Sequence, residues 1–359
     1  MIMNHINRKK TRQVKIGSVT VGGDAPIRIQ SMCTTPTHDI EATVAQIQEL
    51  ESAGCEIIRV ACPTEKDAHA LGEIKKRIKI PLVADIHFNY RLALIALDQG
   101  IDKLRLNPGN IGSRDRIEQV VKRAKERKVP IRIGVNGGSL EKDLLEKYGH
   151  PVPEALVESA QRHVKILEEL DFYDIILSLK ASDVPTMVQA YRLAAQTFDY
   201  PLHLGVTEAG TLLRGSVYNA IGVGTLLQEG IGDTIRISLS AESIEEIKVG
   251  RFILEATGHR KFGPRVVACP SCGRAEVDVF KLANEVETRA MKLNDPMTIS
   301  VLGCVVNGPG EAHESDFGIT GGKEKGMIYI DGKQERVVSE AQLVDQLFSE
   351  IEKRKKKQD

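Results

Sequence analysis

Three cysteines and a glutamate in the last third of the sequence have the residue types and spacing of a metal site. Cys269 and Cys272 form a Cys-x-x-Cys pair, Cys304 follows an apolar run, and Glu311 comes seven residues later, after a Gly-Pro-Gly turn. Thiolates at such spacing can converge on one soft metal centre. Three thiolates and one weaker oxygen ligand suit an iron–sulfur cluster in which one iron is loosely held and available to a substrate.

Two other interpretations of these cysteines stay open on the residues alone. The pair could form a redox disulfide, although no thioredoxin-like pattern surrounds it and Cys304 would be left over. The four residues could instead hold structural zinc, which normally uses a second Cys-x-x-Cys or a histidine pair. The single pair favours a cluster over zinc. The remaining cysteines, Cys33, Cys55 and Cys62, lack metal-ligand spacing and are expected to be buried as small hydrophobic residues.

A second set of chemically capable side chains occurs earlier, in or just after short apolar runs. Its members are Arg59, Asp85, His87, Arg105, Asn107, Arg132, Asn136, Lys180, Ser182, Thr207, Glu208, Arg236 and Ser238. Lysine and arginine are seldom fully buried without a partner. Five cations brought together would repel one another unless an anion lay among them, and guanidinium groups match phosphate oxygens in bidentate geometry. The set therefore predicts a site for a phosphorylated or diphosphate ligand.

Asp85, His87 and Glu208 are the acid–base candidates of this set. His87 alone could equally be structural, but a neighbouring carboxylate can orient it for proton transfer. Glu208 could act as a general acid or pair with an arginine.

Alternating strand-like and helix-like segments must position this second set. The strand-like runs are Ile27–Met32, Glu56–Ala61, Leu82–His87, Lys103–Asn107, Ile131–Asn136, Ile175–Ser182, Leu202–Thr207 and Thr234–Ser240. Helix-like segments between them include Arg114–Arg127 and Pro153–Leu170, whose apolar positions share one face. Eight such units predict a (β/α)8 TIM-type barrel, whose active site lies where the strands end. An open doubly wound sheet is the alternative, but no G-x-G-x-x-G follows an early strand.

The pattern changes near residue 258. We expect a barrel over residues 1–257, a polar Gly- and Pro-containing linker over 258–265, and a small α/β domain over 266–359 that carries the cysteines.

Composition excludes several classes of protein. The chain has 359 residues, 49 basic and 49 acidic side chains and no tryptophan, so nothing directs it to nucleic acid or to an anionic membrane. The first residues lack the apolar core of a signal peptide, and no apolar run is long enough to span a membrane. Six cysteines in a chain of this length are not a disulfide framework. We therefore expect a cytoplasmic protein.

Motifs that contain the cysteine set and most of the second set resemble one family, the 4-hydroxy-3-methylbut-2-enyl diphosphate synthases of the methylerythritol phosphate route to isoprenoids. The motifs are Cys269–Arg274, Gly303–Ala312, Val83–Phe88, Arg105–Asn110, Ile133–Asn136, Lys180–Asp183 and Gly205–Gly210. The resemblance extends from Gln30 to Gly322, nearly the whole chain, and the length is similar to that of the two-domain bacterial form.

The resemblance implies a specific chemistry. It implies a 4Fe–4S cluster on Cys269, Cys272, Cys304 and Glu311, and reductive ring opening of 2-C-methyl-D-erythritol 2,4-cyclodiphosphate. It implies electrons from flavodoxin or ferredoxin, and a homodimer in which the cluster domain of one subunit closes over the barrel of the other. The diphosphate-binding and active-site positions that it implies are Arg59, Arg105, Arg132, Asn136, Lys180, Arg236 and Ser238.

If the resemblance is set aside, the residue types and their spacing are compatible with two other functions. One is a phosphosugar aldolase or isomerase with a structural zinc domain, and the other is a non-enzymatic iron–sulfur electron carrier. Acid-labile sulfide would distinguish a cluster from zinc, and tight binding of a cyclic diphosphate would exclude the carrier.

Overall fold

Eight parallel strands form the core of the first of two structural units. The structure is a computed structural model and describes residues 6–304, 308–322 and 325–358. Its two compact units are Met1–Arg260 and Lys261–Asp359. The strands of the first unit are β3 (Arg28–Met32), β4 (Ile57–Ala61), β5 (Leu82–Asp85), β6 (Lys103–Arg105), β7 (Ile131–Asn136), β8 (Ile175–Lys180), β9 (His203–Leu204) and β10 (Thr234–Ile235).

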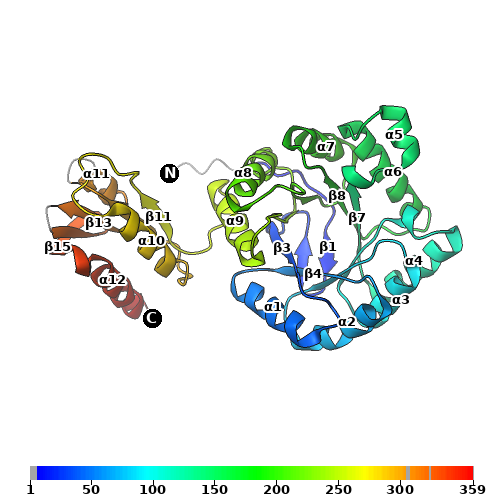
Figure 1. Cartoon of the computed structure of the whole chain (residues 1–359), viewed down its shortest axis with the longest axis horizontal. Coiled ribbons are helices and arrows are strands. Elements are labelled where there is room, and N and C mark those ends of the chain that lie inside the picture. Colours follow the sequence, from blue (N-terminus) through cyan, green and yellow to red (C-terminus); the bar gives the residue numbers. More distant parts are fainter. Residues whose placement is uncertain (1–5, 305–307, 323–324, 359) are drawn as a thin grey trace. The chain divides into compact units, whose positions relative to one another are not determined.

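These strands close into a barrel. The sheet order is β8-β7-β6-β5-β4-β3-β10-β9, and a parallel bridge between Leu177 and Leu202 joins its two ends. Helices surround the strands (Figure 1). They are α1 (Ile40–Ser52), α2 (Glu65–Arg77), α3 (Tyr90–Asp98), α4 (Arg114–Arg127), α5 (Lys142–Tyr148), α6 (Pro153–Glu168), α7 (Val184–Thr197), α8 (Leu212–Gln228) and α9 (Ser243–Ala256). The (β/α)8 prediction is confirmed.

An N-terminal hairpin covers the amino end of the barrel. Its strands are β1 (Val14–Ile16) and β2 (Val19–Val21). Val14, Ile16 and Val21 form a buried cluster with Ile57, Val83 and Ile176, which lie near the amino ends of β4, β5 and β8. Apolar side chains therefore fill this end of the barrel.

The strands β9 and β10 are much shorter than the predicted runs Leu202–Thr207 and Thr234–Ser240. Beyond Arg236 side chains supply part of the backbone pairing: Asn219 Nδ2 donates to the Ser238 carbonyl at 3.4 Å, and Glu246 Oε1 accepts from the Leu239 amide at 3.2 Å. The Ser240 amide then donates to the Gly210 carbonyl at 2.9 Å. Asn219 belongs to α8 and Glu246 to α9, so side chains of the surrounding helices hold the backbone that follows β10.

A buried tyrosine strengthens the closure of the barrel between β8 and β9. The hydroxyl of Tyr191, on α7, accepts a hydrogen bond from the Leu179 amide at 3.1 Å and donates one to the His203 carbonyl at 2.5 Å. Tyr191 has no exposed surface. Because β9 has only two residues, this hydroxyl replaces part of the missing strand ladder.

The second unit is a five-stranded mixed sheet, in which β11, β12 and β13 are parallel and β13, β14 and β15 antiparallel. Its elements are β11 (Arg265–Ala268), α10 (Val279–Ala290), β12 (Thr298–Leu302), α11 (Gly308–His313), β13 (Phe317–Gly322), β14 (Lys325–Ile330), β15 (Lys333–Ser339) and α12 (Leu343–Gln358).

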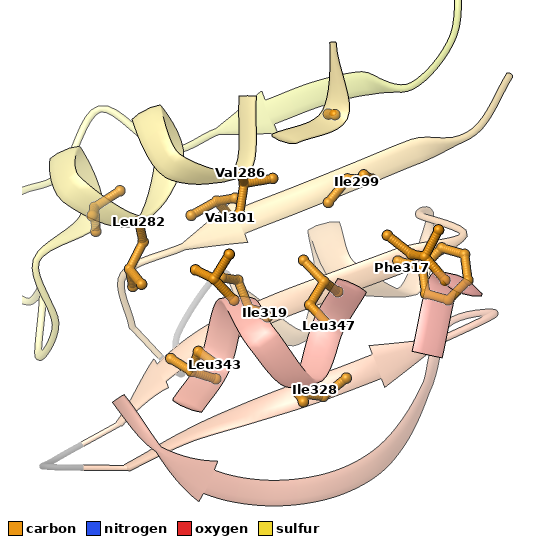
Figure 2. Close-up of a cluster of buried hydrophobic side chains, with 13 residues drawn as sticks. Leu282, Val286, Ile299, Val301, Phe317, Ile319, Ile328, Leu343 and Leu347 are labelled. Carbon is orange, nitrogen blue, oxygen red and sulfur yellow. The ribbon is translucent and has the colours of Figure 1, made fainter. Parts of the chain in front are cut away.

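Two helices cover one face of this sheet. Leu282 and Val286 of α10 and Leu343 and Leu347 of α12 pack with strand residues such as Ile319 in one buried core (Figure 2). A smaller cluster that includes Ala312 of α11 and Tyr329 lies beside Cys269. Cys269 is thus anchored in apolar packing.

Among the residues that the structure describes, no helix has the length and apolarity needed to span a bilayer.

Replacing Tyr191 by Phe should destabilise the barrel by about 2 kcal/mol, because the Leu179 amide and the His203 carbonyl would lose a buried partner. Urea unfolding followed by circular dichroism measures this loss. Tyr218→Phe is the matched control, because Tyr218 is 41% exposed and should change stability by less than about 0.5 kcal/mol. Equal stability of the two variants would show that the Tyr191 hydroxyl does not support the closure.

Candidate active site

A cavity of about 150 Å³ opens at the carboxyl end of the barrel. Its walls come from β4, β5, β6, β7 and β8 and from the segments that follow β9 and β10. The lining residues are Arg59, Asp85, His87, Arg105, Arg132, Gly134, Val135, Asn136, Ser178, Lys180, Thr207 and Arg236. Five of these are cations and one, Asp85, is a carboxylate, so the cavity has the chemistry of an anion site.

Strand alternation places these cations inside the barrel. Side chains two residues apart on a strand share a face. Lys103 and Arg105 therefore share the inner face of β6, and Arg132, Gly134 and Asn136 share that of β7. The pairing of Arg105 with Arg132 in the ladder sets two guanidinium groups on neighbouring strands at the same level.

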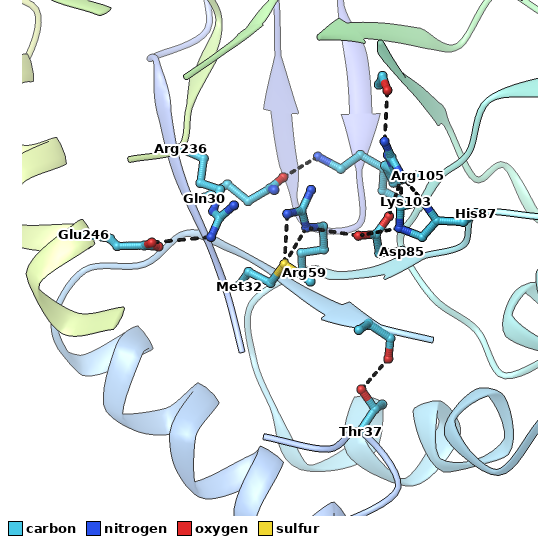
Figure 3. A network of polar contacts seen from close by, with 12 residues as sticks. Gln30, Met32, Thr37, Arg59, Asp85, His87, Lys103, Arg105, Arg236 and Glu246 are labelled. Carbon is cyan, nitrogen blue, oxygen red and sulfur yellow. Dashed lines mark hydrogen bonds and ion pairs between the residues drawn. The ribbon is translucent and has the colours of Figure 1, made fainter. Parts of the chain in front are cut away.

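Asp85 is the anionic centre of this group (Figure 3). Its Oδ1 accepts from Arg105 Nη1 at 3.2 Å, and its Oδ2 lies 3.7 Å from Arg59 Nε and 3.7 Å from His87 Nε2. Burial alone would raise the pKa of the Asp85 carboxyl, but the charge of Arg59 and the contacts with His87 and Arg105 hold that pKa well below its ordinary value. Asp85 is therefore an ionised counter-ion and a poor proton donor.

Arg132 and Lys180 have no such counter-ion. Both line the cavity and are buried, with exposed fractions of 1% and 8%. The structure shows no hydrogen bond or ion pair from either side chain to another described residue, and the buried Nε of Arg132 is unpaired. Burial and the neighbouring cations lower the pKa of both groups well below their ordinary values. Two unpartnered buried cations are unfavourable unless a ligand supplies the missing charge.

Arg105 is held on a backbone platform. Its Nη2 donates to the Gly134 carbonyl at 2.9 Å, and Asn107 fixes Gly134 by donating to the same carbonyl at 3.1 Å and accepting from the Gly134 amide at 2.8 Å. A Cβ atom at Gly134 would lie 2.7 Å from Arg105 Nε. The guanidinium can take this position only because residue 134 is glycine.

A deeper polar layer lies beneath the cavity. Lys103 has no exposed surface, and its Nζ donates to Gln30 Oε1 at 2.8 Å. His203 Nδ1 lies 2.7 Å from Thr234 Oγ1. Burial and the charges of Arg132 and Arg59 lower the pKa of Lys103 well below its ordinary value. Sequence reasoning missed this layer, although the spacing of Lys103 and Arg105 placed both on one strand face.

Two of the cysteines in the second unit lie at one edge of its sheet. Cys269 directly follows β11 and Cys304 follows β12, which pair in parallel. The Sγ of Cys269 accepts from the Gly303 amide at 3.3 Å. Cys272 is exposed, and hydrogen bonds from the backbone and side chain of Arg274 lower the pKa of its thiol. Glu311 is exposed on α11.

These residues fit an iron–sulfur group in donor type, because thiolates are its usual ligands. In the part of the chain that the structure describes, however, no three His, Cys, Asp or Glu side chains are arranged to hold a metal ion. Val305, Val306 and Asn307 of the second cysteine motif lie outside the described residues.

The three other cysteines are buried, as the sequence predicts. Burial raises the pKa of the Cys33, Cys55 and Cys62 thiols to about 12. They are protonated and unreactive in the folded barrel.

Comparison with known proteins covers both units. Residues 11–251 match the family model of the GcpE TIM-barrel domain, and residues 265–353 match that of the GcpE protein C-terminal domain. The 4-hydroxy-3-methylbut-2-en-1-yl diphosphate synthase (flavodoxin) of Geobacillus thermodenitrificans is 59% identical over 348 residues, which are 97% of this chain and 93% of the relative. The chain belongs to the 4-hydroxy-3-methylbut-2-en-1-yl diphosphate synthase family.

A second relative agrees with this assignment, and one solved structure shares the fold of the barrel. The synthase (flavodoxin) of Listeria monocytogenes is 56% identical and covers 97% of this chain and 94% of its own length. Among solved structures, a dihydropteroate synthase from Stenotrophomonas maltophilia matches with a TM-score of 0.50 at 12% identity, over 70% of this chain and 100% of its own. That match shows the barrel fold alone.

The synthase-family barrel brings together most, but not all, of the site residues expected from the sequence. Arg59, Asp85, His87, Arg105, Arg132, Asn136, Lys180 and Arg236 share the cavity. Glu208 and Ser238 are not among its lining residues. Glu208 is exposed in a left-handed backbone conformation with φ of 53°. Arg132 is the second residue of β7 rather than its last, so it lies deeper than a strand-end position.

Replacing Gly134 by Ala should displace the Arg105 guanidinium and weaken binding of inorganic diphosphate by about tenfold, the equivalent of one charge-assisted hydrogen bond. Isothermal titration calorimetry measures the affinity. Gly138→Ala is the matched control, because a Cβ there would lie 3.7 Å from Asn136 Oδ1, an ordinary contact. Unchanged affinity in Gly134→Ala would remove Arg105 from the anion site.

Proposed function

We propose that this chain catalyses the two-electron ring opening and dehydroxylation of 2-C-methyl-D-erythritol 2,4-cyclodiphosphate to 4-hydroxy-3-methylbut-2-enyl diphosphate. The product is the one in the name of its curated relatives, which match 97% of the chain. The aldolase and electron-carrier alternatives have no comparable support.

The observation that carries the proposal is the cavity with five cations and one carboxylate. A diphosphate would supply the negative charge that is missing beside Arg132 and Lys180. The diphosphate would bind beside the Arg105 guanidinium, which Asp85 and the Gly134 carbonyl already hold in position. Because these groups are in place before the ligand arrives, the charge released when the ring opens requires little reorganisation.

The barrel residues would bind and orient the cyclic diphosphate. Arg59, Arg105, Arg132, Lys180 and Arg236 are the proposed diphosphate ligands, and Asn136 is a polar partner in the same wall. His87 is the stronger proton-transfer candidate, because its side chain is 57% exposed and lies beside the ionised Asp85. Ser238 and Glu208 stay candidates that the cavity itself does not include.

The second unit would hold the redox group. We assign Cys269, Cys272 and Cys304 as thiolate ligands and Glu311 as the oxygen ligand of a 4Fe–4S cluster. When bound, such a cluster supplies single electrons and a Lewis-acidic iron. Glu311 would be the most loosely bound of the four ligands, because a carboxylate is a weaker donor to iron than a thiolate.

The partners follow from this chemistry. Reduced flavodoxin, named with the relatives, is the proposed electron donor, with ferredoxin as the alternative carrier. A homodimer would let the cluster unit of one subunit serve the barrel of the other. The cytoplasm, which keeps thiols reduced, is the proposed compartment.

An anaerobic assay with reduced flavodoxin and the cyclic diphosphate tests the proposal directly, by following formation of the alkenyl diphosphate. Cys304→Ala should lose iron, acid-labile sulfide and at least about a thousandfold of activity, because one thiolate ligand is gone. Cys55→Ala is the matched thiol control, because Cys55 lies buried before β4. This variant protein should keep its iron and sulfide. Normal iron and turnover in Cys304→Ala would refute the ligand assignment.

Alkylation tests the ligand set without any measurement of activity. In protein that carries the cluster, iodoacetamide should leave Cys269, Cys272 and Cys304 unmodified, and removal of iron with a chelator should expose them. Cys33, Cys55 and Cys62 are the internal control, because burial should protect them in both forms. Mass spectrometry of peptides reads each site. Full alkylation of Cys272 in iron-loaded protein would exclude it as a ligand.

A further inference from the structure

Lys180 is a buried amine in a cavity with too few negative charges. It is 8% exposed and lines the cavity, and its Nζ has no acceptor among the residues that the structure describes. A Cβ atom at Gly205 would lie 3.1 Å from this Nζ. The amine therefore lies close to the backbone that follows β9, on a side chain that is otherwise buried.

Cations outnumber carboxylates around Lys180. The titratable and charged groups that face it are Arg59 on β4, Asp85 and His87 at the end of β5, Lys103 and Arg105 on β6, Arg132 on β7, His203 on β9, Arg236 after β10 and Glu246 on α9. Both carboxylates already have partners. Asp85 pairs with Arg59 and Arg105, and Glu246 accepts from Ser31 at 2.9 Å and from Arg236 at 3.4 Å.

Among the lysine and arginine side chains of the cavity wall, Lys180 is the one that can relieve this excess of positive charge by losing a proton. Arginine stays protonated in proteins, whereas a lysine amine becomes neutral when it is buried beside like charges. Burial, followed by the charges of Arg236, Arg59 and Arg132, lowers the pKa of Lys180 well below its ordinary value. Burial and these charges therefore disfavour the ammonium form of Lys180 in the free cavity.

We propose that Lys180 takes up a proton when the cavity binds its dianionic ligand, so that ligand binding and proton uptake are coupled. The inference rests on the proposed function, which places a cyclic diphosphate with two negative charges in this cavity. Those charges favour the ammonium form and raise the pKa of the amine again.

The coupling matches the balance of the proposed reaction. The reaction adds two electrons and one proton to the dianionic substrate, and it yields the trianionic product and one water. A proton that enters with the substrate is therefore already in the cavity when the ring opens. Lys180 is then a proton-carrying residue as well as an anion ligand.

Calorimetry under anaerobic conditions tests the coupling on the cluster-loaded protein. The cyclic diphosphate is a suitable probe, because each of its phosphorus atoms carries one ester and one anhydride bond, and the single acidic oxygen left on each stays ionised at mildly alkaline pH. Titrations in buffers of different ionisation enthalpy give the number of protons taken up per ligand. The wild type should take up about one proton, and its affinity should fall about tenfold per unit rise in pH within this range.

Lys180→Arg is the decisive variant, because arginine is charged before the ligand arrives. It should bind the cyclic diphosphate with about one proton fewer and with an affinity that no longer depends on pH. Lys122→Arg, on the exposed surface of α4, should behave as the wild type. The variant leaves Lys103 and His203 unchanged, so it separates Lys180 from these deeper groups.

Each other outcome has a definite meaning. Binding by the wild type without proton uptake, or equal uptake in Lys180→Arg, overturns the proposed coupling and leaves the proposed function standing. A wild type that does not bind the cyclic diphosphate at all overturns the proposed function and this inference with it. If Lys180→Arg does not fold, the wild-type pH dependence decides, and a flat affinity refutes the coupling.

Discussion

Electrostatic repulsion inside the barrel is the constraint on which the rest of the first unit depends. Five cations line one cavity whose wall holds a single carboxylate, Asp85; they are Arg59, Arg105, Arg132, Lys180 and Arg236. A second carboxylate, Glu246, pairs with Arg236 from outside that wall, and Lys103 lies beneath the cavity. Such a group is unstable without a rigid frame and without a ligand that completes its charge. The frame consists of strand ladders, a tyrosine that closes the gap at β9, and a glycine platform for Arg105. An anion bound in the cavity would therefore also stabilise the barrel, because it reduces the repulsion between the buried cations.

Much of this arrangement is predictable from the sequence. Alternating apolar runs and helical faces predict the barrel, and cations within those runs predict an anion site, because strand ends of a (β/α)8 barrel meet at one edge. The depth of each side chain was not predictable. It depends on the stagger between strands, which places Arg132 near the start of β7 and lets β9 end after two residues. Lys103 and the Gly134 platform were missed for the same reason, since their partners lie on other strands.

The second unit shows a different limit of sequence reasoning. The spacing of Cys269 and Cys272 and the position of Cys304 after a strand predict that the thiols approach one another. The parallel pairing of β11 with β12 does set Cys269 beside the Gly303 amide. Ligand geometry around a metal also depends on the exposed loop of Cys272 and on Glu311 in the short helix α11, and spacing cannot fix either.

The hairpin of β1 and β2 has a consequence for how the barrel meets charged molecules. The amino end of the barrel is filled by the apolar side chains of Val14, Ile16 and Val21. These side chains exclude from that end the water that would otherwise screen the cations. Low-dielectric walls direct field lines toward the open mouth and concentrate counter-ions there. A chain of zero net charge can therefore attract a small anion locally, at the mouth of the barrel. The attraction weakens with ionic strength, although the molecule as a whole has no excess charge to screen.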